Sequence, residues 1–297
     1  MVCGKQLKKM QEEINMKLPF YIDLKGKVAV ITGAGGVLCS TMAHALADCG
    51  ASVALLDLNE EAALSSAETI AKEGLKAKGY QANALEKESL KAAHEKILKD
   101  FGPCDILING AGGNHPRATT DKETFEKTDL DDETKTFFDL EQNGVEFVFN
   151  LNFIGTLLPT QEFAKDMIGR EGCNILNISS MNAYRPLTKI PAYSAAKAAV
   201  SNFTQWLSVH FAKEGIRVNA LAPGFFVTNQ NERLLYHPDG SPTERTGKIL
   251  AATPMKRFGK TEELLGSVLF LIDNEAAGFI TGVVLPIDGG FSAYSGV

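Results

Sequence analysis

The stretch Lys27-Val28-Ala29-Val30-Ile31, followed by Thr32-Gly33-Ala34-Gly35-Gly36, indicates the fold of this chain. The first five residues have the apolar, β-branched character of a buried strand, and the glycines allow a tight turn into a helix. That helix is predicted over Met42–Cys49, and a second strand, Ser52–Asp57, comes next. A strand, a glycine-rich turn, a helix and another strand predict a βαβ unit with parallel strands.

The same alternation continues along the chain. A further helix is predicted over Glu60–Glu73, and further strands at Asp105–Asn109, Asn174–Ile178, Arg217–Ala222 and Val283–Ile287. Apolar strands separated by helices of about ten or more residues favour a parallel sheet with helices on both faces. We therefore predict the α/β class, with one doubly wound domain over 24–297 and an N-terminal extension over 1–23.

One segment interrupts the alternation. An insertion at about 114–145 is polar and rich in acidic residues, and it contains no clear strand. It follows Asn109-Gly110-Ala111-Gly112, at the carboxyl end of a predicted strand, where doubly wound sheets bind their ligands. Connections in compact domains are usually short, so a long one is either functional or disordered. Two interpretations stay open: a lid on the substrate side, and a solvated embellishment.

Composition argues against several classes of protein. The 297 residues are 44% hydrophobic and carry a formal net charge of -6 without a basic cluster, so no nucleic-acid partner is expected. No apolar run is long enough to span a bilayer, and the charged first residues do not form a signal peptide, which favours a cytoplasmic protein away from membranes. The five cysteines form no CxxC pair and the five histidines no HExxH spacing, so we expect reduced thiols and no required metal.

The glycine turn and the end of the second strand predict a dinucleotide site. Gly33, Gly35 and Gly36 let the backbone approach a pyrophosphate, and the N-terminus of the following helix favours its negative charge. Asp57 can accept hydrogen bonds from an adenine ribose diol and repel a 2′-phosphate, and no arginine adjoins it. The pattern therefore favours NAD over NADP as the cofactor. The alternative for Asp57 is a helix cap.

The stretch Tyr193-Ser194-Ala195-Ala196-Lys197 places a phenol and an ammonium on one face of a helix. A phenol with a pKa of about 10 is a poor base at neutral pH, and a nearby positive charge lowers that pKa. Such a tyrosine can exchange a proton with an alcohol or a carbonyl, and Ser180 could hydrogen-bond the same reacting oxygen. The alternative is an ordinary amphipathic helix with both side chains at its surface.

These motifs together resemble the short-chain dehydrogenase/reductase family. The counterparts of the family's motifs occur in the expected order, at Thr32–Gly36, Asn109–Gly112, Ser180/Tyr193/Lys197 and Pro223-Gly224. The resemblance runs from about Leu24 to Asp288-Gly289-Gly290, which is nearly the whole chain. It implies a Rossmann-type fold and an oxidoreductase that uses a nicotinamide cofactor.

The resemblance also implies a role for each matching residue. Tyr193 would be the general acid/base, Lys197 would lower its pKa and bind the nicotinamide ribose, and Ser180 would orient the reacting oxygen. Asn152 matches a fourth catalytic position that holds a water in a proton relay; the alternative is a residue that kinks a helix. Besides Tyr193 and Lys197, the implied cofactor-binding residues are Gly33, Gly35, Gly36, Val37, Leu38, Asp57, Asn83, Ala84, Asn109, Ala111, Gly112, Pro223, Gly224, Phe226 and Thr228.

Two positions depart from the family pattern. Val37 and Cys39 stand where the family's turn has its second and third glycines. We expect the phosphate contact to shift, and Cys39 to pack where the helix and a strand normally approach closely. Asn83 stands where relatives have an aspartate that contacts adenine, and its amide can still form a hydrogen bond.

The loops indicate the kind of substrate. Amide and histidine side chains suit a polyhydroxylated molecule, because each hydroxyl needs a partner once it leaves water. The predicted substrate residues are Asn114, His115, Asn182, Asn229 and Arg233. Four arginines could clamp a carboxylate, with solvated or structural roles as the alternative: Arg117, Arg185, Arg233 and Arg245.

This set of loops looks like that of the D-mannonate oxidoreductases (fructuronate reductases) of the short-chain type. The resemblance implies interconversion of D-mannonate and D-fructuronate, with a hydride moving between C5 of the sugar acid and C4 of the nicotinamide. It also implies a homotetramer. One alternative is a gluconate 5-dehydrogenase or another sugar-acid or polyol dehydrogenase; a different class is a dinucleotide-binding protein without turnover.

Overall fold

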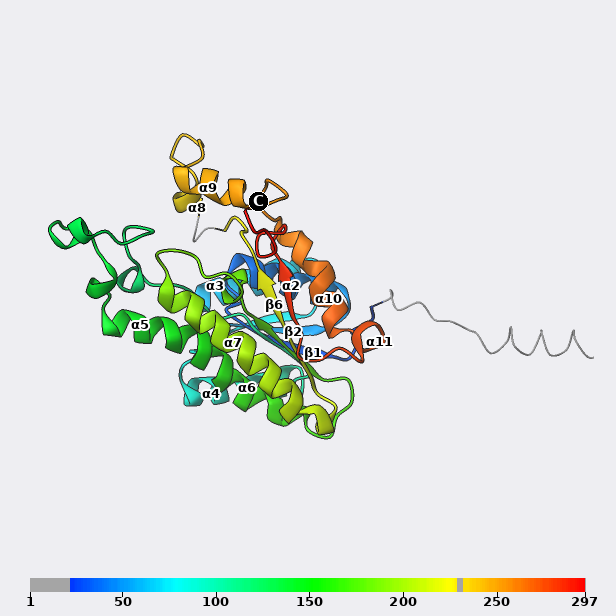
Figure 1. Ribbon diagram of the computed structural model, residues 1–297. Helices are drawn as coiled ribbons and strands as arrows, with labels where there is room; N and C mark the ends of the chain where they lie inside the picture. The colour runs from blue at the N-terminus through cyan, green and yellow to red at the C-terminus, as the bar shows by residue number, and fades with distance from the viewer. Residues whose placement is uncertain (1–21, 229–231, 297) are drawn as a thin grey trace, which may run out of the picture.

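Among the residues that the structure describes, seven parallel strands form one sheet through the middle of the molecule (Figure 1). The computed structural model describes residues 22–228 and 232–296, so almost all of the predicted extension 1–23 lies outside it. The strands follow the order β3-β2-β1-β4-β5-β6-β7. Their bounds are β1 Val28–Thr32, β2 Ser52–Asp57, β3 Ala77–Gln81, β4 Ile106–Asn109, β5 Asn174–Ile178, β6 Arg217–Pro223 and β7 Val284–Ile287.

Helices lie on both faces of this sheet. The longer ones are α2 Val37–Asp48, α3 Glu60–Lys72, α4 Lys87–Asp100, α5 Gln142–Phe149, α6 Gly155–Phe163, α7 Pro191–His210, α9 Glu244–Ala252 and α10 Leu265–Ile272. Two four-residue helices are α8 Glu232–Leu235 and α11 Asn274–Ala277. None of the helices in the described ranges is long and apolar enough to cross a membrane. The predicted class, a doubly wound domain with a parallel sheet, is confirmed.

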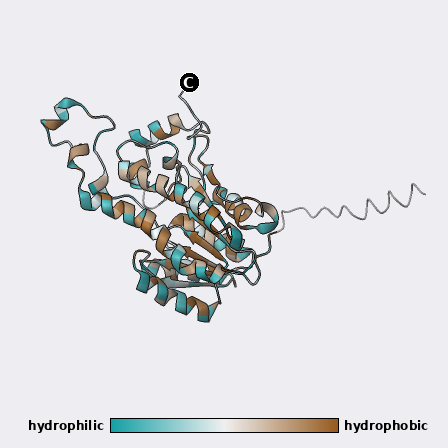
Figure 2. Cartoon of the chain, turned by 60° about the horizontal axis from the view of Figure 1, so that its bottom comes forward, coloured by the Kyte–Doolittle hydropathy of each residue, from teal (hydrophilic) through white to brown (hydrophobic). Residues whose placement is uncertain are grey.

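The alternation of side chains along each strand creates two separate cores. In β1, Ala29 and Ile31 join a cluster that includes residues of α2, α3 and α10. Val28 and Val30 point the other way and join a cluster that includes residues of α4, α6 and α7. Figure 2 shows hydrophobic colour concentrated around the sheet, with hydrophilic colour on the outward faces of the helices. Burial of both faces explains why the strands appear in the sequence as continuous apolar runs.

The strand order reverses between β1 and β4, because the chain leaves β1 toward β2 and β3 and returns on the other side. In such sheets the ligand crevice lies at the carboxyl ends of the strands on either side of this point. The carboxyl edge here carries the glycine turn after β1, the loop after β4, Ser180 after β5 and Pro223-Gly224 at the end of β6. The fold therefore gathers the predicted motifs at one edge of the sheet.

The insertion forms three short 3-10 helices, η1 Pro116–Ala118, η2 Lys127–Leu130 and η3 Phe137–Asp139. Helix α5 begins at Gln142, so the last four residues of the predicted segment belong to that helix. In Figure 1 the insertion is the green segment of loops above α5. Its Thr120 amide donates a 2.9 Å hydrogen bond to the carbonyl oxygen of Lys189, shortly before α7. Glu123 also forms a 2.9 Å ion pair with Lys248 of α9.

Candidate active site

The turn after β1 is shaped by close backbone contacts. Gly33 has a positive φ of 67°, and a Cβ there would lie 2.9 Å from the backbone of Ala111. The Thr32 hydroxyl accepts hydrogen bonds from the amides of Gly110 and Ala111. These contacts hold the turn against the loop that follows β4.

Gly36 then caps α2 without a side-chain hydrogen bond, so the amides of Val37 and Leu38 begin a helix whose first turn has no acidic residue. Such a helix end favours an anion.

Asp57 lies beside this turn, as predicted from its place at the end of β2. Its carboxylate accepts hydrogen bonds of 2.9 Å from the amides of Gly35 and Asn59. A Cβ on Gly35 would lie 3.0 Å from the same carboxylate, so a glycine is needed there. The cap of α3 is Asn59, whose side chain accepts from the Ala62 amide. Asp57 is therefore not the N-cap of α3, and the alternative interpretation as a helix cap is wrong.

Cys39 occupies the close approach between α2 and the loop after β4. A Cβ on Gly110 would lie 2.2 Å from the Cys39 Sγ, so the sulfur fills the space that a third glycine would leave open. The thiol is buried, and burial raises the pKa of Cys39 to about 12. It therefore remains a neutral thiol at physiological pH and acts as a packing group.

The remaining predicted cofactor residues line the same edge. Asn83 follows β3, but its amide already bonds within the loop, donating to Glu86 and accepting from the Leu85 amide. Ala84 lies next to it, close to Gly155 at the start of α6. Asn109 is buried at the end of β4 and donates to Thr160 and Asn177. This pairing links β4, β5 and α6, so Asn109 has a structural role here.

On the other side of the crevice, the loop after β6 carries the last of the predicted cofactor residues. Pro223 ends β6, and a Cβ on Gly224 would lie 2.6 Å from the backbone of Asp288 after β7. Phe226 is buried against Gly259, and Thr228 is the last described residue before 229–231. A cavity of about 360 Å³ lies beside this loop, and the catalytic candidates do not line it.

Tyr193 and Lys197 lie one turn apart near the start of α7. The Lys197 Nζ lies 5.7 Å from the centre of the Tyr193 ring. It donates a 2.7 Å hydrogen bond to the carbonyl oxygen of Ile178, at the end of β5. Lys197 is only 4% exposed, and burial lowers its pKa to about 8. The ammonium is therefore held under the loop after β4, where a Cβ on Gly112 would lie 3.0 Å from it.

The pKa of Tyr193 departs from the expected direction. Burial raises it above the ordinary value for a phenol, and a hydrogen bond with the Ser180 hydroxyl opposes the rise. Lys197 was expected to lower this pKa, but its ammonium faces the Ile178 carbonyl. The cost of removing a phenolate from water therefore dominates. The effect of Ser180 on this pKa places its hydroxyl close to the Tyr193 phenol, and the catalytic roles of the two residues stay predictions.

Asn152 lies in a π-helical turn, η4 Asn150–Ile154, between α5 and α6. Its side chain donates 2.7 Å and 2.8 Å hydrogen bonds to the carbonyl oxygens of Gly113 and Val148. Its Oδ1 accepts from the Gly113 amide at 3.2 Å. The irregular helix agrees with the alternative of a residue that kinks a helix, whereas the role of Asn152 in a proton relay stays a prediction. A Cβ on Gly112 would lie 2.7 Å from its oxygen, so little space separates them.

Sequence patterns did not reveal the groups that hold Lys197. Its carbonyl oxygen accepts hydrogen bonds from the hydroxyls of Ser179 and Ser201, both at 3.1 Å. The Ile178 carbonyl that binds its ammonium is a backbone group, which no residue type could have indicated. Among these groups, only the Ser179 hydroxyl could have been predicted, because Ser179 adjoins the predicted site residue Ser180.

The predicted substrate residues are only partly brought together. His115 caps η1 by accepting a 3.1 Å hydrogen bond from the Arg117 amide at Nδ1, and its ring packs edge-on against Phe147. Asn114 donates to the Thr119 hydroxyl, which holds it within the insertion. Asn182 is buried, two residues after Ser180. Arg233 is exposed on α8, and Asn229 lies outside the described residues.

The other candidate arginines are engaged or exposed. Arg117 lies 3.9 Å from the Glu141 carboxylate, and Arg185 donates to the carbonyl oxygen of Ser292. Arg245 is exposed on α9. No single arginine among the described residues is marked by its contacts as the carboxylate clamp.

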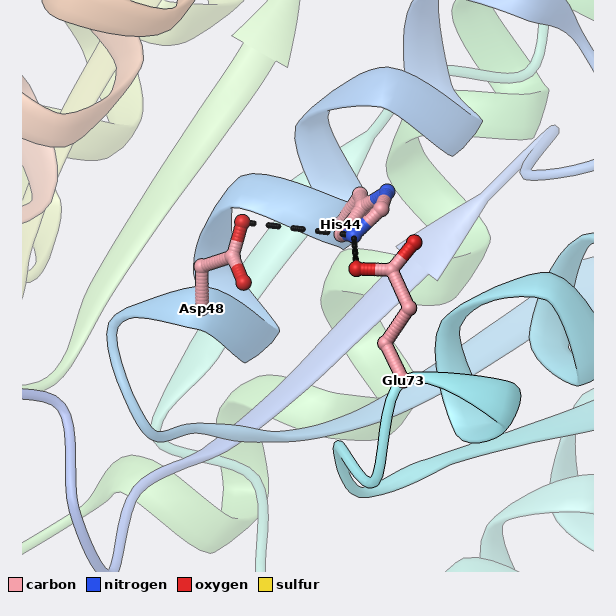
Figure 3. A group of neighbouring side chains, drawn as sticks. All are labelled: His44, Asp48 and Glu73. Carbon is pink, nitrogen blue, oxygen red and sulfur yellow. Dashed lines mark hydrogen bonds and ion pairs between the residues drawn. The ribbon is translucent and has the colours of Figure 1, made fainter.

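Figure 3 shows a separate group of side chains formed by His44, Asp48 and Glu73. The His44 Nε2 lies 3.0 Å from a Glu73 oxygen and 3.9 Å from an Asp48 oxygen. Both carboxylates are exposed, and the contacts connect the second half of α2 to the end of α3. Because α2 begins at the carboxyl edge and ends before β2, Asp48 lies at the opposite edge from the glycine turn. We interpret the group as ion pairs between helices.

Comparison with known proteins agrees with this geometry. The family model described as short chain dehydrogenase matches residues 27–237. A crystal structure with bound NAD, of a Haemophilus influenzae protein provisionally named as a D-mannonate oxidoreductase, has 62% identity and a TM-score of 0.90, covering 95% of this chain and 100% of that one. An uncharacterized oxidoreductase of Bacillus subtilis, UxuB, is 51% identical over 94% of this chain and 100% of its own. A gluconate 5-dehydrogenase of Gluconobacter oxydans is 35% identical over 93% and 99% of the two chains. The chain therefore belongs to the short-chain dehydrogenase family of oxidoreductases.

Proposed function

We propose that this chain is an NAD-dependent oxidoreductase that interconverts D-mannonate and D-fructuronate. The observation that carries the proposal is that the Tyr193 phenol lies close to the Ser180 hydroxyl and one turn from the buried ammonium of Lys197. A phenol, a hydroxyl and an ammonium at the carboxyl edge of a doubly wound sheet form a proton-transfer site next to a dinucleotide crevice.

The residues present fit NAD as the cofactor. The start of α2, where the N-cap Gly36 offers no side-chain hydrogen bond, would receive the pyrophosphate, and the Asp57 carboxylate would bind the adenine ribose and repel a 2′-phosphate. The buried Lys197 ammonium would donate to the hydroxyls of the second ribose. When bound, the nicotinamide supplies a hydride donor or acceptor. NAD bound to the Haemophilus influenzae relative supports the same assignment.

In ketone reduction, Ser180 would donate a hydrogen bond to the carbonyl oxygen and Tyr193 would give that oxygen its proton. The raised pKa of the partly buried Tyr193 suits an acid that holds its proton until negative charge develops on the substrate oxygen. In the oxidative direction the same phenol oxygen would take the proton from the alcohol. Asn152 would position the loop after β4, through its bonds to Gly113 in both directions.

The substrate assignment rests on the relatives and on the chemistry of the loops. The name of the 62% identical relative points to D-mannonate, and the 35% identical relative points to gluconate. D-fructuronate and 5-keto-D-gluconate both carry their ketone at C5, and they differ in configuration only at C2, next to the carboxylate. Either molecule would therefore place the same reacting end beside Ser180 and Tyr193. The residues that contact the carboxylate end of the substrate therefore determine which of the two acids the enzyme prefers.

We assign contacts with the carboxylate end of the substrate to the insertion and to α8. The His115 Nδ1 accepts a hydrogen bond, so its Nε2 carries the ring proton and can donate to a substrate oxygen. Asn114 lies next to it in the chain, and Arg233 provides a positive charge from α8. In this arrangement the insertion is the lid on the substrate side, tied to α9 through Glu123 and Lys248.

The direct test measures oxidation of NADH by the full-length protein with each of the two 5-keto acids. We expect a higher kcat/KM with D-fructuronate than with 5-keto-D-gluconate, and a higher kcat/KM with NADH than with NADPH. Preference for 5-keto-D-gluconate would assign the protein to the gluconate 5-dehydrogenases. Measurable NADH binding without turnover of either acid would instead support a dinucleotide-binding protein without catalysis.

We also propose a homotetramer located in the cytoplasm. Helix α7 carries Trp206 and Val209, which are 55% and 78% exposed. Large exposed apolar side chains on one helix are typical of protein interfaces. Light scattering of the purified protein should give four times the 32.0 kDa mass of one chain.

A further inference from the structure

Asn182 has an unsatisfied group beside the proposed catalytic serine. It lies in η6 Met181–Ala183, directly after Ser180, and its backbone amide donates a 3.2 Å hydrogen bond to the Ser180 Oγ. The residue is only 4% exposed. Its side-chain oxygen, Oδ1, is buried and has no hydrogen-bond partner among the described residues.

An unpaired buried amide oxygen is costly, because it has lost its bonds to water without gaining others. Most buried polar atoms in native proteins are paired, so an exception needs an explanation. Exchanging the oxygen and nitrogen of the amide would only place an unpaired donor at the same position. The amide is adjacent to Ser180, and η6 packs against the helix that carries Tyr193. A ligand at the reacting site is therefore the natural source of the missing partner.

We propose that Asn182 is a specificity residue that binds a hydroxyl group on a carbon next to the reacting carbonyl. This inference rests on the proposed reduction of a 5-keto sugar acid. Such a substrate has hydroxyls on C4 and C6, on either side of the C5 ketone. When Ser180 holds the carbonyl oxygen, one of these hydroxyls donates to the Asn182 Oδ1. The enzyme then accepts α-hydroxy ketones and discriminates against simple ketones.

The unpaired state explains the discrimination. A site with a buried hydrogen-bonding group rejects an analogue that lacks the matching hydroxyl, because the analogue leaves that group unpaired in the complex. Replacing the Asn182 amide with an apolar side chain should weaken the rejection of analogues and should remove the unpaired oxygen from the free protein. The protein without it would lose the part of its preference that this one hydroxyl supplies, and it would also lose the cost of an unpaired polar atom in the free state.

The experiment compares two substrates and three variants of the full chain. D-fructuronate carries the adjacent hydroxyls, and 5-oxohexanoate has the same carbon chain, carboxylate and C5 ketone without any hydroxyl. Asn182→Leu removes the amide at similar volume, and Asn182→Asp keeps an acceptor oxygen. Asn202→Leu, at an exposed position on α7, is the control. The readouts are kcat/KM for each substrate, the Kd of NADH and the thermal midpoint.

We expect Asn182→Leu to lower kcat/KM for D-fructuronate by about 10- to 100-fold, the usual effect of losing one buried hydrogen bond. The value for 5-oxohexanoate and the Kd of NADH should stay close to wild type, and the thermal midpoint should equal or exceed it. Asn182→Asp should retain most of the preference for D-fructuronate. The control should behave as wild type in all readouts.

Equal losses on both substrates, weaker NADH binding or a lowered thermal midpoint in Asn182→Leu would overturn the proposal, because each indicates a general structural or cofactor role. A wild-type enzyme that reduces 5-oxohexanoate as well as D-fructuronate would also overturn it. These outcomes leave the proposed function standing. Failure of the wild type to reduce either 5-keto sugar acid would refute the proposed function, and this inference with it.

Discussion

The Lys197 ammonium donates its 2.7 Å hydrogen bond to the Ile178 carbonyl oxygen and not to the Tyr193 phenol, whose ring centre lies 5.7 Å away. This contact anchors α7 to the end of β5. It also leaves the ammonium buried, with a pKa lowered to about 8. Lys197 therefore gains or loses its charge within the range in which the enzyme can be assayed.

The affinity for NADH should depend on pH through this group. A lysine is charged below its pKa, so at neutral pH the ammonium can donate to the nicotinamide ribose. As the pH rises through about 8, the charge disappears and the Kd of NADH should increase. Titration of NADH fluorescence at a series of pH values checks this. Lys197→Met should bind weakly at every pH; an unchanged pH dependence in this variant would assign the effect to another group.

Removing the phenol hydroxyl should abolish proton transfer and spare cofactor binding. Tyr193→Phe is expected to lower kcat/KM by about 10²- to 10⁴-fold, the usual contribution of general acid–base catalysis. The Kd of NADH should remain near the wild-type value. Tyr294→Phe, at a residue that is 41% exposed, is a matched control and should keep full activity. A fully active Tyr193→Phe enzyme would remove the basis of the proposed proton transfer.

The Asp57 carboxylate should determine the choice between NADH and NADPH. Asp57→Asn keeps the shape of the side chain and removes the charge that repels a 2′-phosphate. We expect the ratio of kcat/KM for NADH to that for NADPH to fall by about 10- to 100-fold, as for the loss of one charge-assisted hydrogen bond. Glu68→Gln, at an exposed position on α3, should leave the ratio unchanged. An unchanged ratio in Asp57→Asn would show that the carboxylate does not face the ribose.

The packing between Cys39 of α2 and Gly110 in the loop after β4 can be tested by measuring stability, without an activity assay. A Cβ on Gly110 would lie 2.2 Å from the Cys39 Sγ and 2.8 Å from the Thr32 carbonyl oxygen. Gly110→Ala should therefore reduce the free energy of unfolding by about 1–3 kcal/mol, the range for overpacked cores. Adding Cys39→Ala should recover part of the loss, because the sulfur is then absent. Gly266→Ala should not destabilise the protein, because no described residue outside the adjoining turns of its own helix lies within 4 Å of the added Cβ.

The ion pair between Glu123 and Lys248 distinguishes a lid from an embellishment. Both side chains are substantially exposed, so the pair should contribute little to stability. If the insertion closes over the substrate, Glu123→Gln should raise KM for the sugar acid while the thermal midpoint and the Kd of NADH stay unchanged. Glu133→Gln, also in the insertion and exposed, is the control. An unchanged KM in Glu123→Gln would favour the solvated embellishment.

Most of the sheet could be predicted because its strands are buried on both faces. The predicted Ser52–Asp57 and Asn174–Ile178 coincide with β2 and β5. The strand β3, Ala77–Gln81, was missed because it lies at the edge of the sheet, where Lys78 and Gln81 are exposed and no continuous apolar run forms. The order of motifs along the chain then placed the candidate site at one edge.

The finer chemistry of the site could not be predicted from spacing. The i, i+4 relationship correctly brought Tyr193 and Lys197 together, but it cannot show that the ammonium binds a backbone carbonyl. For the same reason it gave the wrong direction for the Tyr193 pKa, which depends on burial. Asn152 was identified by its motif, whereas its π-helical turn and its bonds to Gly113 arise from the packing of the loop.

The central claim is that Tyr193 and a bound nicotinamide together reduce C5 of a sugar acid. The most direct measurement is the reduction of D-fructuronate with NADH carrying deuterium at the transferable position of C4, with the product analysed by NMR. The account predicts D-mannonate with deuterium at C5, formed by the wild type and lost in Tyr193→Phe. Deuterium at another carbon, or a labelled product that forms equally well without the Tyr193 hydroxyl, would contradict it.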